Sequence, residues 1–349
     1  MYILDIHFSN TYIHANGQNV ACKLGIFLYA QYTQYTMKRV LITGGFGLVG
    51  SAVQSVSLEH TSQYEFIFIK SRDYDLSNME ETMSMFEKYK PEYVIHLAAC
   101  VGGLFKNMNS KVDMLERNLT MNFNVVKCCH DYGVEKLVAC LSTCIFPDKT
   151  SYPINEDMLH DGAPHTSNDA YAYAKRMLEI HCQAYRENYG SNFVCVIPTN
   201  IYGPHDNYSL EDGHVIPSLI HKCYNAKLAN DKFVVRGTGA PLRQFIYSID
   251  LARLLLWTLE KVNRENIILS VSEIEEVPIE YVARLIARAF NYEQNMIFDD
   301  SFADGQFKKT ADNCKLMNRL DSTFEFTPIE KGIKSSVEWF INNYDDARK

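Results

Sequence analysis

The sequence predicts an α/β protein in which a doubly wound parallel sheet is followed by a smaller mixed α/β lobe. Two observations support this fold class. Short apolar runs of strand length alternate with longer helix-like stretches through the first half of the chain, and a glycine-rich turn follows the first run. Such alternation is typical of parallel strands that are joined by right-handed helical crossovers.

The apolar runs are short and rich in Val, Ile and Leu, as expected of parallel strands that are buried on both faces. They cover residues 38–43, 65–70, 93–98, 136–142 and 192–198. The helix-like stretches between them cover residues 50–58, 78–89, 118–132 and 171–189.

The alternation breaks after residue 203, where residues 206–213 are polar and predict a loop. Beyond the loop we expect helices at 214–227, 246–259, 278–290 and 328–344, and strands at 267–270 and 296–298. We therefore expect a Rossmann-type domain at 37–203, with returning segments near 243–272, and a mainly substrate-binding lobe at 204–349. Ligands of such folds bind beyond the carboxyl ends of the strands.

The bulk properties exclude several classes of protein. A net charge of −8 and a pI near 5.8 disfavour a nucleic-acid partner, because such binding needs a basic surface. No apolar run reaches the roughly 18 residues of a membrane span, so no membrane partner is expected. Ten cysteines without a C-x-x-C pair predict free thiols in a reducing cytoplasm, and no metal site.

Residues 1–36 differ in character from the rest of the chain. They hold one Lys and no Arg, and their Tyr, Asn and Gln residues follow no clear period. They resemble neither a signal peptide nor a transit peptide. We expect a poorly ordered extension ahead of a natural start at Met37.

A dinucleotide site is predicted where the first strand turns into a helix. Gly44, Gly47 and Gly50 allow a tight turn and the close approach of a diphosphate to the start of the helix, where Leu48 and Val49 lie. The spacing G-x-x-G-x-x-G is a weak signal alone. It gains weight here because a strand precedes it and a helix follows.

The end of the second strand indicates which dinucleotide is bound. An acidic residue there would receive the ribose hydroxyls of NAD, whereas this chain has Lys70 and Arg72, which suit a 2′-phosphate. The sequence therefore favours NADP(H). Further residues expected beside the cofactor are Asp75, Leu76, Leu97, Ala98 and Ala99.

Three residues form the pattern of a hydride-transfer site. Tyr171 and Lys175 are four residues apart and share one face of a helix. We expect the nearby ammonium to lower the pKa of the Tyr171 phenol. Ser142, at the end of the fourth strand, is placed to hydrogen-bond a substrate carbonyl. With the glycine turn, these residues predict transfer of a hydride between a nicotinamide cofactor and a ketone.

Several segments resemble the extended short-chain dehydrogenases/reductases, from residue 37 to the end of the chain. Within that family they are similar to the epimerase-reductases that act on GDP-4-keto-6-deoxy-D-mannose. The segments are LAACVGGLFKN (97–107), CLSTCIFPDKT (140–150), YAYAKRM (171–177), IPTNIYGPHDN (197–207), EDGHVIP (211–217), RQFIYS (243–248) and DGQFKKT (304–310).

The resemblance implies epimerisation at C3 and C5 followed by NADPH reduction at C4, which gives GDP-L-fucose. It assigns Cys144 as the base and His214 as the acid of the epimerisations. Ser142, Thr143 and Tyr171 would stabilise the enolate oxygen, and Tyr171 would finally protonate O4. The order of the two epimerisations is left open.

The resemblance also implies ligand contacts. Arg243 is the best candidate for the substrate diphosphate, with Lys222 and Lys309 as weaker ones, and Asn200 matches a substrate contact. Where many relatives place Trp before a Gly-Thr/Ser-Gly sequence, this chain has Arg236, so an aromatic contact would be lost. Positions matched to the cofactor are Lys175, Pro198, Asn200, Ile201 and His214.

Other functions remain as alternatives. A nucleotide-sugar 4-epimerase or 4,6-dehydratase would use the same scaffold, but a dehydratase would have an acidic residue after Thr143, where this chain has Cys144. A catalytically silent NADP-binding sensor would typically lack Tyr171 or Lys175. The resemblance further implies a homodimer, with residues 113–132 and 171–190 as the expected contacts.

Overall fold

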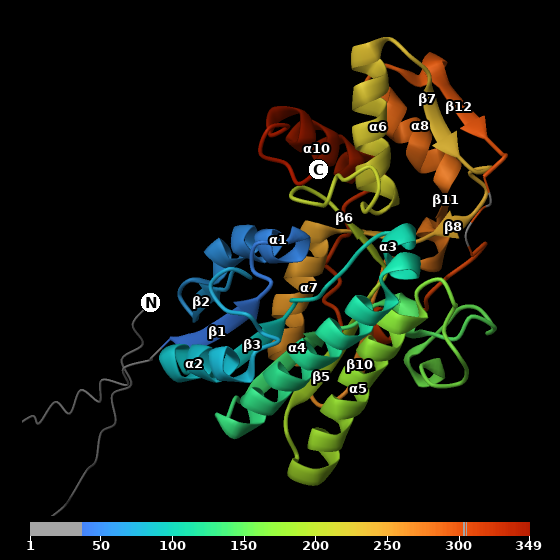
Figure 1. Ribbon diagram of the computed structural model, residues 1–349. Helices are drawn as coiled ribbons and strands as arrows, with labels where there is room; N and C mark the ends of the chain where they lie inside the picture. Colours follow the sequence, from blue (N-terminus) through green and yellow to red (C-terminus); the bar gives the residue numbers. More distant parts are fainter. Residues whose placement is uncertain (1–36, 303, 305) are drawn as a thin grey trace, which may run out of the picture. The chain divides into compact units, whose positions relative to one another are not determined.

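A six-stranded parallel sheet organises the first part of the chain (Figure 1). Its strand order is β10-β5-β4-β3-β1-β2, so the direction of winding reverses between β1 and β3. The strands are β1 (Lys38–Thr43), β2 (Tyr64–Phe68), β3 (Tyr93–His96), β4 (Lys136–Cys140), β5 (Phe193–Pro198) and β10 (Asn266–Leu269). Ligands of doubly wound folds bind at such a reversal, beyond the carboxyl ends of the strands.

The computed structural model describes residues 37–302, 304 and 306–349. Each strand predicted from the apolar runs is present; β1 and β5 end where expected, and β2, β3 and β4 each end two residues earlier. The expectation of a poorly ordered extension at residues 1–36 lies outside the described residues.

Helices cover both faces of the sheet (Figure 1). Buried apolar side chains of α2, α4 and α5 pack on one face, and those of α1 and α7 pack on the other. The bounds are α1 (Leu48–Ser57), α2 (Met79–Tyr89), α4 (Lys111–Asp131), α5 (Asp169–Tyr189) and α7 (Ser248–Lys261). The sheet is therefore buried on both sides, which explains its nearly continuous apolar strands.

Two helical predictions differ from the structure. The expected helix at 246–259 begins only at Ser248, because Phe245–Tyr247 pairs in parallel with Asn200–Tyr202 as strands β9 and β6. The expected helix at 118–132 begins seven residues earlier, at Lys111. The sequence reading also missed α3 (Leu104–Asn109), a short helix between β3 and α4.

A third apolar core lies in the second half of the chain. Buried side chains from three helices and from β7 and β9 form it, with Phe340 fully buried among them. The remaining elements are α6 (Val215–Ala229), β7 (Phe233–Arg236), β8 (Leu242–Arg243), β11 (Val277–Pro278), α8 (Ile279–Ala289), β12 (Met296–Asp299), α9 (Cys314–Met317) and α10 (Ile329–Asn342). The division of function between 37–203 and 204–349 stays a prediction.

Two expectations from composition can be compared with the described residues. Nine of the ten cysteines lie there, and all nine are free. Across the same residues, no helix has the length and apolar character needed to cross a membrane.

Candidate active site

The glycine turn is built by close backbone packing at the carboxyl ends of β1 and β3. Gly44 has a φ of +66°, and a Cβ there would lie 2.8 Å from the amide nitrogen of Ala98. A Cβ at Gly50 would lie 2.4 Å from the carbonyl oxygen of Gly44. Both positions therefore require glycine, and the turn holds the start of α1 against the residues that follow β3.

The start of α1 leaves donors free for a ligand. Gly47 caps the helix without a side-chain hydrogen bond, and a Cβ there would meet only the carbonyl oxygen of Gly44, at 3.5 Å. The amides of Leu48 and Val49 lie in the first turn, where a helix offers no carbonyl partners. The free amides and the helix dipole suit the diphosphate of a dinucleotide.

The basic residues after β2 lie above this turn. The ammonium of Lys70 is 4.3 Å from the centroid of the Phe46 ring, and Phe46 belongs to the glycine turn. Arg72 is exposed and lies 3.8 Å from the carboxylate of Asp73. Lys70 therefore lies at the edge of the expected dinucleotide site, and Arg72 follows two residues later on the surface; both side chains suit a 2′-phosphate.

The two residues expected beside the adenine have local partners. A carboxylate oxygen of Asp75 accepts hydrogen bonds from the backbone and hydroxyl of Ser77, at 2.9 and 2.6 Å. Leu76 is buried in the core beside α2. After β3, Leu97, Ala98 and Ala99 are half-buried, and the amide of Ala98 donates to the hydroxyl of Thr43 at 3.2 Å.

Ser142 and Cys144 lie directly beyond the end of β4. Ser142 caps the single 3₁₀ turn Thr143–Ile145, and the amide of Cys144 donates to its hydroxyl at 3.4 Å. Thr143 and Cys144 are buried, whereas Ser142 is partly exposed. The short turn thus brings a hydroxyl and a thiol to the same strand end.

Lys175 is tied to the same strand. Its ammonium donates to the carbonyl oxygen of Cys140 at 2.7 Å and lies 5.9 Å from the centroid of the Tyr171 ring. Burial lowers the pKa of Lys175. The hydrogen bond places Tyr171, one helical turn earlier, next to the turn that carries Ser142 and Cys144.

The predicted effect of Lys175 on Tyr171 is wrong. Burial raises the pKa of Tyr171 well above its ordinary value, and the nearby Cys144, Cys140 and Cys100 add to this effect. The desolvation of the phenol outweighs an ammonium that is already engaged with a backbone carbonyl. Tyr171 therefore stays protonated and suits the role of an acid.

The Cys144 thiol lies in a site that opposes its ionisation but also offers a cation. Burial raises its pKa, while Lys309, the Ser142 hydroxyl and Lys175 act in the opposite direction. Lys309 is only partly exposed, and burial lowers the pKa of its own ammonium. Lys309 was expected to bind substrate; the structure also makes it the leading stabiliser of the thiolate.

His214 is the N-terminal cap of α6, and its imidazole makes no capping hydrogen bond. It is exposed to solvent, yet the surrounding protein desolvates it enough to lower its pKa. The loop before it is anchored to the residues after β3, because the amide of Gly103 donates to the carbonyl oxygen of Asp212 at 2.8 Å. His214 is therefore accessible, burial favours its neutral form, and it lies before α6, whereas Cys144 follows β4.

Arg243 is held by backbone carbonyls. Its guanidinium donates to the oxygens of Leu242 and Gln306, each at 2.6 Å. One nitrogen also lies 3.4 Å from the oxygen of Phe307. Arg243 is thus rigidly oriented, but some of its guanidinium N–H groups already donate to backbone carbonyls.

The other expected substrate contacts come from β6, α6 and β7. Asn200 donates to the carbonyl oxygen of Gln244 at 2.9 Å, while Pro198 is buried at the end of β5 and Ile201 is half-buried. Lys222 lies near Arg236, which lowers the pKa of Lys222 in addition to burial. Neither cation has an ion-pair partner among the described residues. From the sequence, Arg236 is expected only to remove an aromatic contact with the ligand. In the structure its guanidinium lies 4.6 Å from the centroid of the Phe302 ring.

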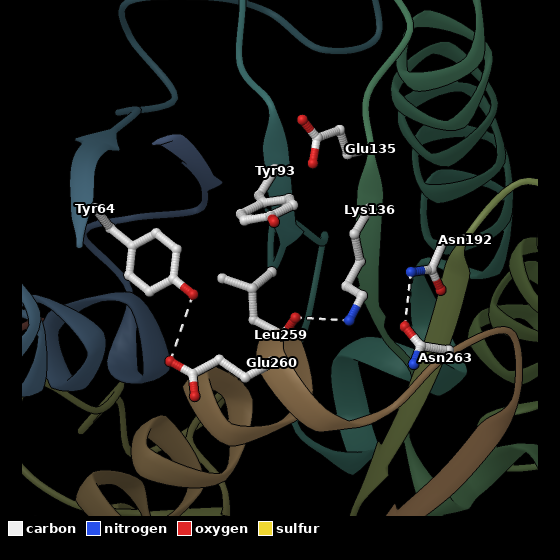
Figure 2. Close-up of a pocket in the computed structure, with 8 residues that line it drawn as sticks. All are labelled: Tyr64, Tyr93, Glu135, Lys136, Asn192, Leu259, Glu260 and Asn263. Carbon is white, nitrogen blue, oxygen red and sulfur yellow. Dashed lines mark hydrogen bonds between the residues drawn. The ribbon is translucent and has the colours of Figure 1, made fainter. Parts of the chain in front are cut away.

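A polar depression of about 370 Å³ lies at the opposite, amino edge of the sheet (Figure 2). Its side chains bond mainly to one another or to the backbone: Lys136 to the carbonyl oxygen of Leu259 at 2.6 Å, and Asn192 to Asn263 at 2.8 Å. The hydroxyl of Tyr64 lies 3.4 Å from Glu260. These bonds link strand starts to the end of α7, so the depression is explained by the fold.

Comparisons with known proteins agree with the geometry of the site. The model of the NAD dependent epimerase/dehydratase family matches residues 40–271. A GDP-L-fucose synthase of Dictyostelium discoideum is 54% identical over 91% of this chain and 100% of that relative. A probable GDP-L-fucose synthase of Drosophila melanogaster is 50% identical over 90% of this chain and 100% of its own length. The chain belongs to the GDP-L-fucose synthases of this family.

A solved structure supports the same conclusion for the fold. The crystal structure of a GDP-L-fucose synthetase from Naegleria fowleri bound to NADP has a TM-score of 0.84 and 52% sequence identity, covering 89% of this chain and 95% of that one. The predicted Rossmann-type fold class is confirmed. The match to the family model, over residues 40–271, includes the turn with Ser142 and Cys144.

Replacement of Gly44 tests the dinucleotide site. We expect Gly44→Ala to weaken NADPH binding at least about tenfold, because the new methyl group would push Ala98 and the turn apart. Isothermal titration calorimetry measures the effect. Gly133→Ala is the matched control, since its φ of +68° is equally strained but a Cβ there meets nothing within 4 Å. Equal NADPH affinities in the two variants would contradict the predicted role of this turn.

Replacement of Lys309 tests the electrostatics of Cys144. Because the Lys309 cation favours the thiolate, Lys309→Gln should raise the pKa of Cys144. Any step that needs the thiolate then shifts to higher pH and slows at neutral pH. The rate of thiol alkylation against pH measures this shift, with Cys144→Ser defining the background. Lys308→Gln is the control, because Lys308 lies 3.8 Å from Glu276 instead; an unshifted Lys309→Gln profile would refute the assignment.

Proposed function

We propose that the protein converts GDP-4-keto-6-deoxy-D-mannose to GDP-L-fucose by epimerisation at C3 and C5 and reduction at C4 with NADPH. The observation that carries the proposal is the single turn after β4. It presents a hydroxyl suited to hold a ketone, Ser142, and a thiol suited to remove a neighbouring proton, Cys144, beside the partly buried phenol of Tyr171. A simple ketone reductase needs the first and the last of these groups but not the thiol.

The residues around the glycine turn fit NADP(H). We propose that the amides of Leu48 and Val49 hold the diphosphate, that Lys70 and Arg72 bind the 2′-phosphate, and that Leu97 to Ala99 lie along the nucleotide. When bound, NADPH supplies the hydride for C4. The open space beside Gly47 supports this fit, because a side chain there would occupy it.

The epimerisations follow from the acidity that a ketone gives its neighbours. The 4-keto group acidifies the C–H bonds at C3 and C5, so that a base can remove each proton to form an enolate. In the proposal the Cys144 thiolate removes the proton, and the protonated imidazole of His214 gives one to the opposite face and is left neutral, the form that burial favours. The hydroxyls of Ser142 and Tyr171 donate to the enolate oxygen and stabilise its charge.

The reduction uses the same donors. As C4 is reduced, its oxygen becomes an alkoxide, and Tyr171 gives it a proton. Lys175 remains bonded to the carbonyl of Cys140 and stabilises the phenolate that is left. The raised pKa of Tyr171 supports this direction, because the phenol starts the step protonated.

The substrate diphosphate needs cations on the lobe opposite the glycine turn. We propose that Lys222 and Arg236 provide two of them, because neither has an ion-pair partner among residues 37–302, 304 and 306–349. Arg243 contributes the N–H groups that its carbonyl partners leave free, and Asn200 contacts the sugar.

We also infer that the protein forms homodimers in the cytosol. Apolar side chains stay exposed along α4 and α5: Val112, Phe123, Tyr173, Met177, Ile180 and Tyr189. An exposed apolar stripe on two adjacent helices is typical of a four-helix interface between two subunits. Free cysteines fit a reducing compartment, and cell fractionation tests that location.

Disruption of this stripe tests the homodimer. Wild-type protein should sediment at about twice the chain mass of 40.1 kDa, and Ile180→Glu should shift it to the monomer by placing a charge in the interface. Analytical ultracentrifugation measures the mass. Leu228→Glu is the control, because Leu228 is an exposed residue of α6, outside the stripe. A monomeric wild type, or an unchanged Ile180→Glu variant, would exclude this interface.

Deuterium incorporation tests the reaction itself. Protein incubated in heavy water with NADP and the 4-keto-6-deoxy substrate should incorporate deuterium at C3 and C5. NADPH added afterwards should be consumed one for one with the C4 ketone. Cys144→Ser should slow incorporation by about a hundredfold or more while NADPH affinity changes little. Mass spectrometry and NMR of the product measure the label.

Cys314→Ser is the matched control, because Cys314 is exposed and far from β4 in the sequence. Reduction without incorporation would remove the epimerase half of the proposal. Incorporation that survives in Cys144→Ser would show that another group is the base.

A further inference from the structure

The last residues of the chain lie against the loop that leads to His214. The amide of Tyr208 donates to the carbonyl oxygen of Arg348 at 2.8 Å, and Asn207 and Arg348 pair as a β-bridge. The guanidinium of Arg348 also donates to the carbonyl oxygen of His205 at 2.7 Å. The side chain and the backbone of Arg348 thus contact the loop at His205, Asn207 and Tyr208.

The loop continues from these residues to His214 through a closed turn. Gly213 donates its amide to the carbonyl oxygen of Ser209 at 3.0 Å, and the amide of Asp212 donates to the Ser209 hydroxyl at 3.1 Å. A Cβ at Gly213 would lie 2.7 Å from the carbonyl oxygen of Asn207. Because Asn207 and Gly213 touch, a displacement of one is transmitted directly to the residue before His214.

The other side of the loop rests on the dinucleotide-binding part of the fold. Gly103 donates to Asp212 at 2.8 Å, and Lys106 lies 3.9 Å from the Asp212 carboxylate. The loop is therefore clamped between the residues after β3 and the end of the chain. If the clamp opened on the Arg348 side, the loop would keep only the contacts on the Gly103 side.

The position of His214 depends on the loop that precedes it. No side-chain hydrogen bond orients its imidazole at the helix cap, so its position is set by the backbone of residues 207–214. We propose that the C-terminal tripeptide 347–349, through Arg348, is a positioning element that holds His214 for proton transfer in the epimerisations. The inference rests on the proposed function.

The residues around Arg348 also help to hold the loop before His214 in place. Asp206 is buried, and one of its carboxylate oxygens has no hydrogen-bond partner among the described residues. Burial raises the pKa of Asp206 to about 7, while Arg348 acts to lower it. Trp339 of α10 packs on His205, with ring centroids 4.5 Å apart, and on Tyr208. The loop is therefore placed by α10 and the chain end together.

The experiment compares two variants with wild type. Arg348→Ala removes the bond to His205 but keeps the backbone pairing, and deletion of residues 347–349 removes both. Deuterium incorporation into the 4-keto substrate should fall by about tenfold in Arg348→Ala and by up to about a hundredfold in the deletion, because small displacements of an acid slow proton transfer steeply. Reduction of the ketone already epimerised at C3 and C5, measured at saturating NADPH, should stay within about twofold.

Two further measurements separate positioning from general stability. In a His214→Asn background, Arg348→Ala should cause no further loss of incorporation, because both changes act on the same group. Hydrogen exchange of the amides at 207–213 should speed up in the deletion variant. Arg288→Ala is the matched control, since Arg288 lies on α8 and forms an exposed ion pair with Glu293.

Two outcomes would overturn the proposed role of Arg348. Wild-type incorporation in Arg348→Ala and in the deletion variant would overturn it. A parallel loss of incorporation and reduction would also overturn it, because this would mark a purely structural role. Absence of incorporation in wild type would instead refute the proposed function on which the inference depends.

Discussion

The hydrogen bond between Lys175 and the carbonyl of Cys140 is the contact on which the site depends. It joins the first half of α5 to the last residue of β4, at 2.7 Å and out of solvent. Ser142 and Cys144 follow that carbonyl, and Tyr171 precedes Lys175 by one turn. One buried bond therefore sets the register between the helix that carries the acid and the turn that carries the thiol. A buried ammonium without this partner would be costly, which gives the bond its strength.

Desolvation dominates the electrostatics around this contact. Burial raises the pKa of Cys144 and of Tyr171, and lowers the pKa of Lys175, Lys309 and His214. Each group is thereby pushed toward its neutral form. Such a site suits a reaction in which protons move while little net charge is exposed to water. Because burial opposes ionisation of Cys144, the charge of the nearby Lys309 ammonium has a large effect on the fraction of thiolate.

The proposed base and acid are held by separate parts of the fold. The glycine turn and the turn after β4 belong to the parallel sheet, whereas His214 belongs to a loop clamped between the residues after β3 and the end of the chain. The acid and the base of the proposed epimerisations therefore approach from different parts of the sequence.

The amino-acid sequence by itself determined the order of the strands and helices, the glycine turn and the spacing of Tyr171 and Lys175, because these depend on local periodicity and on neighbours a few residues apart. It did not show that residues 245–247 form a strand rather than the start of a helix, since pairing with β6 decides this. Nor did it show the raised pKa of Tyr171, the cation beside Cys144 or the role of Arg348 in holding the His214 loop. Those properties depend on burial and on contacts between distant segments, which only the tertiary structure brings together.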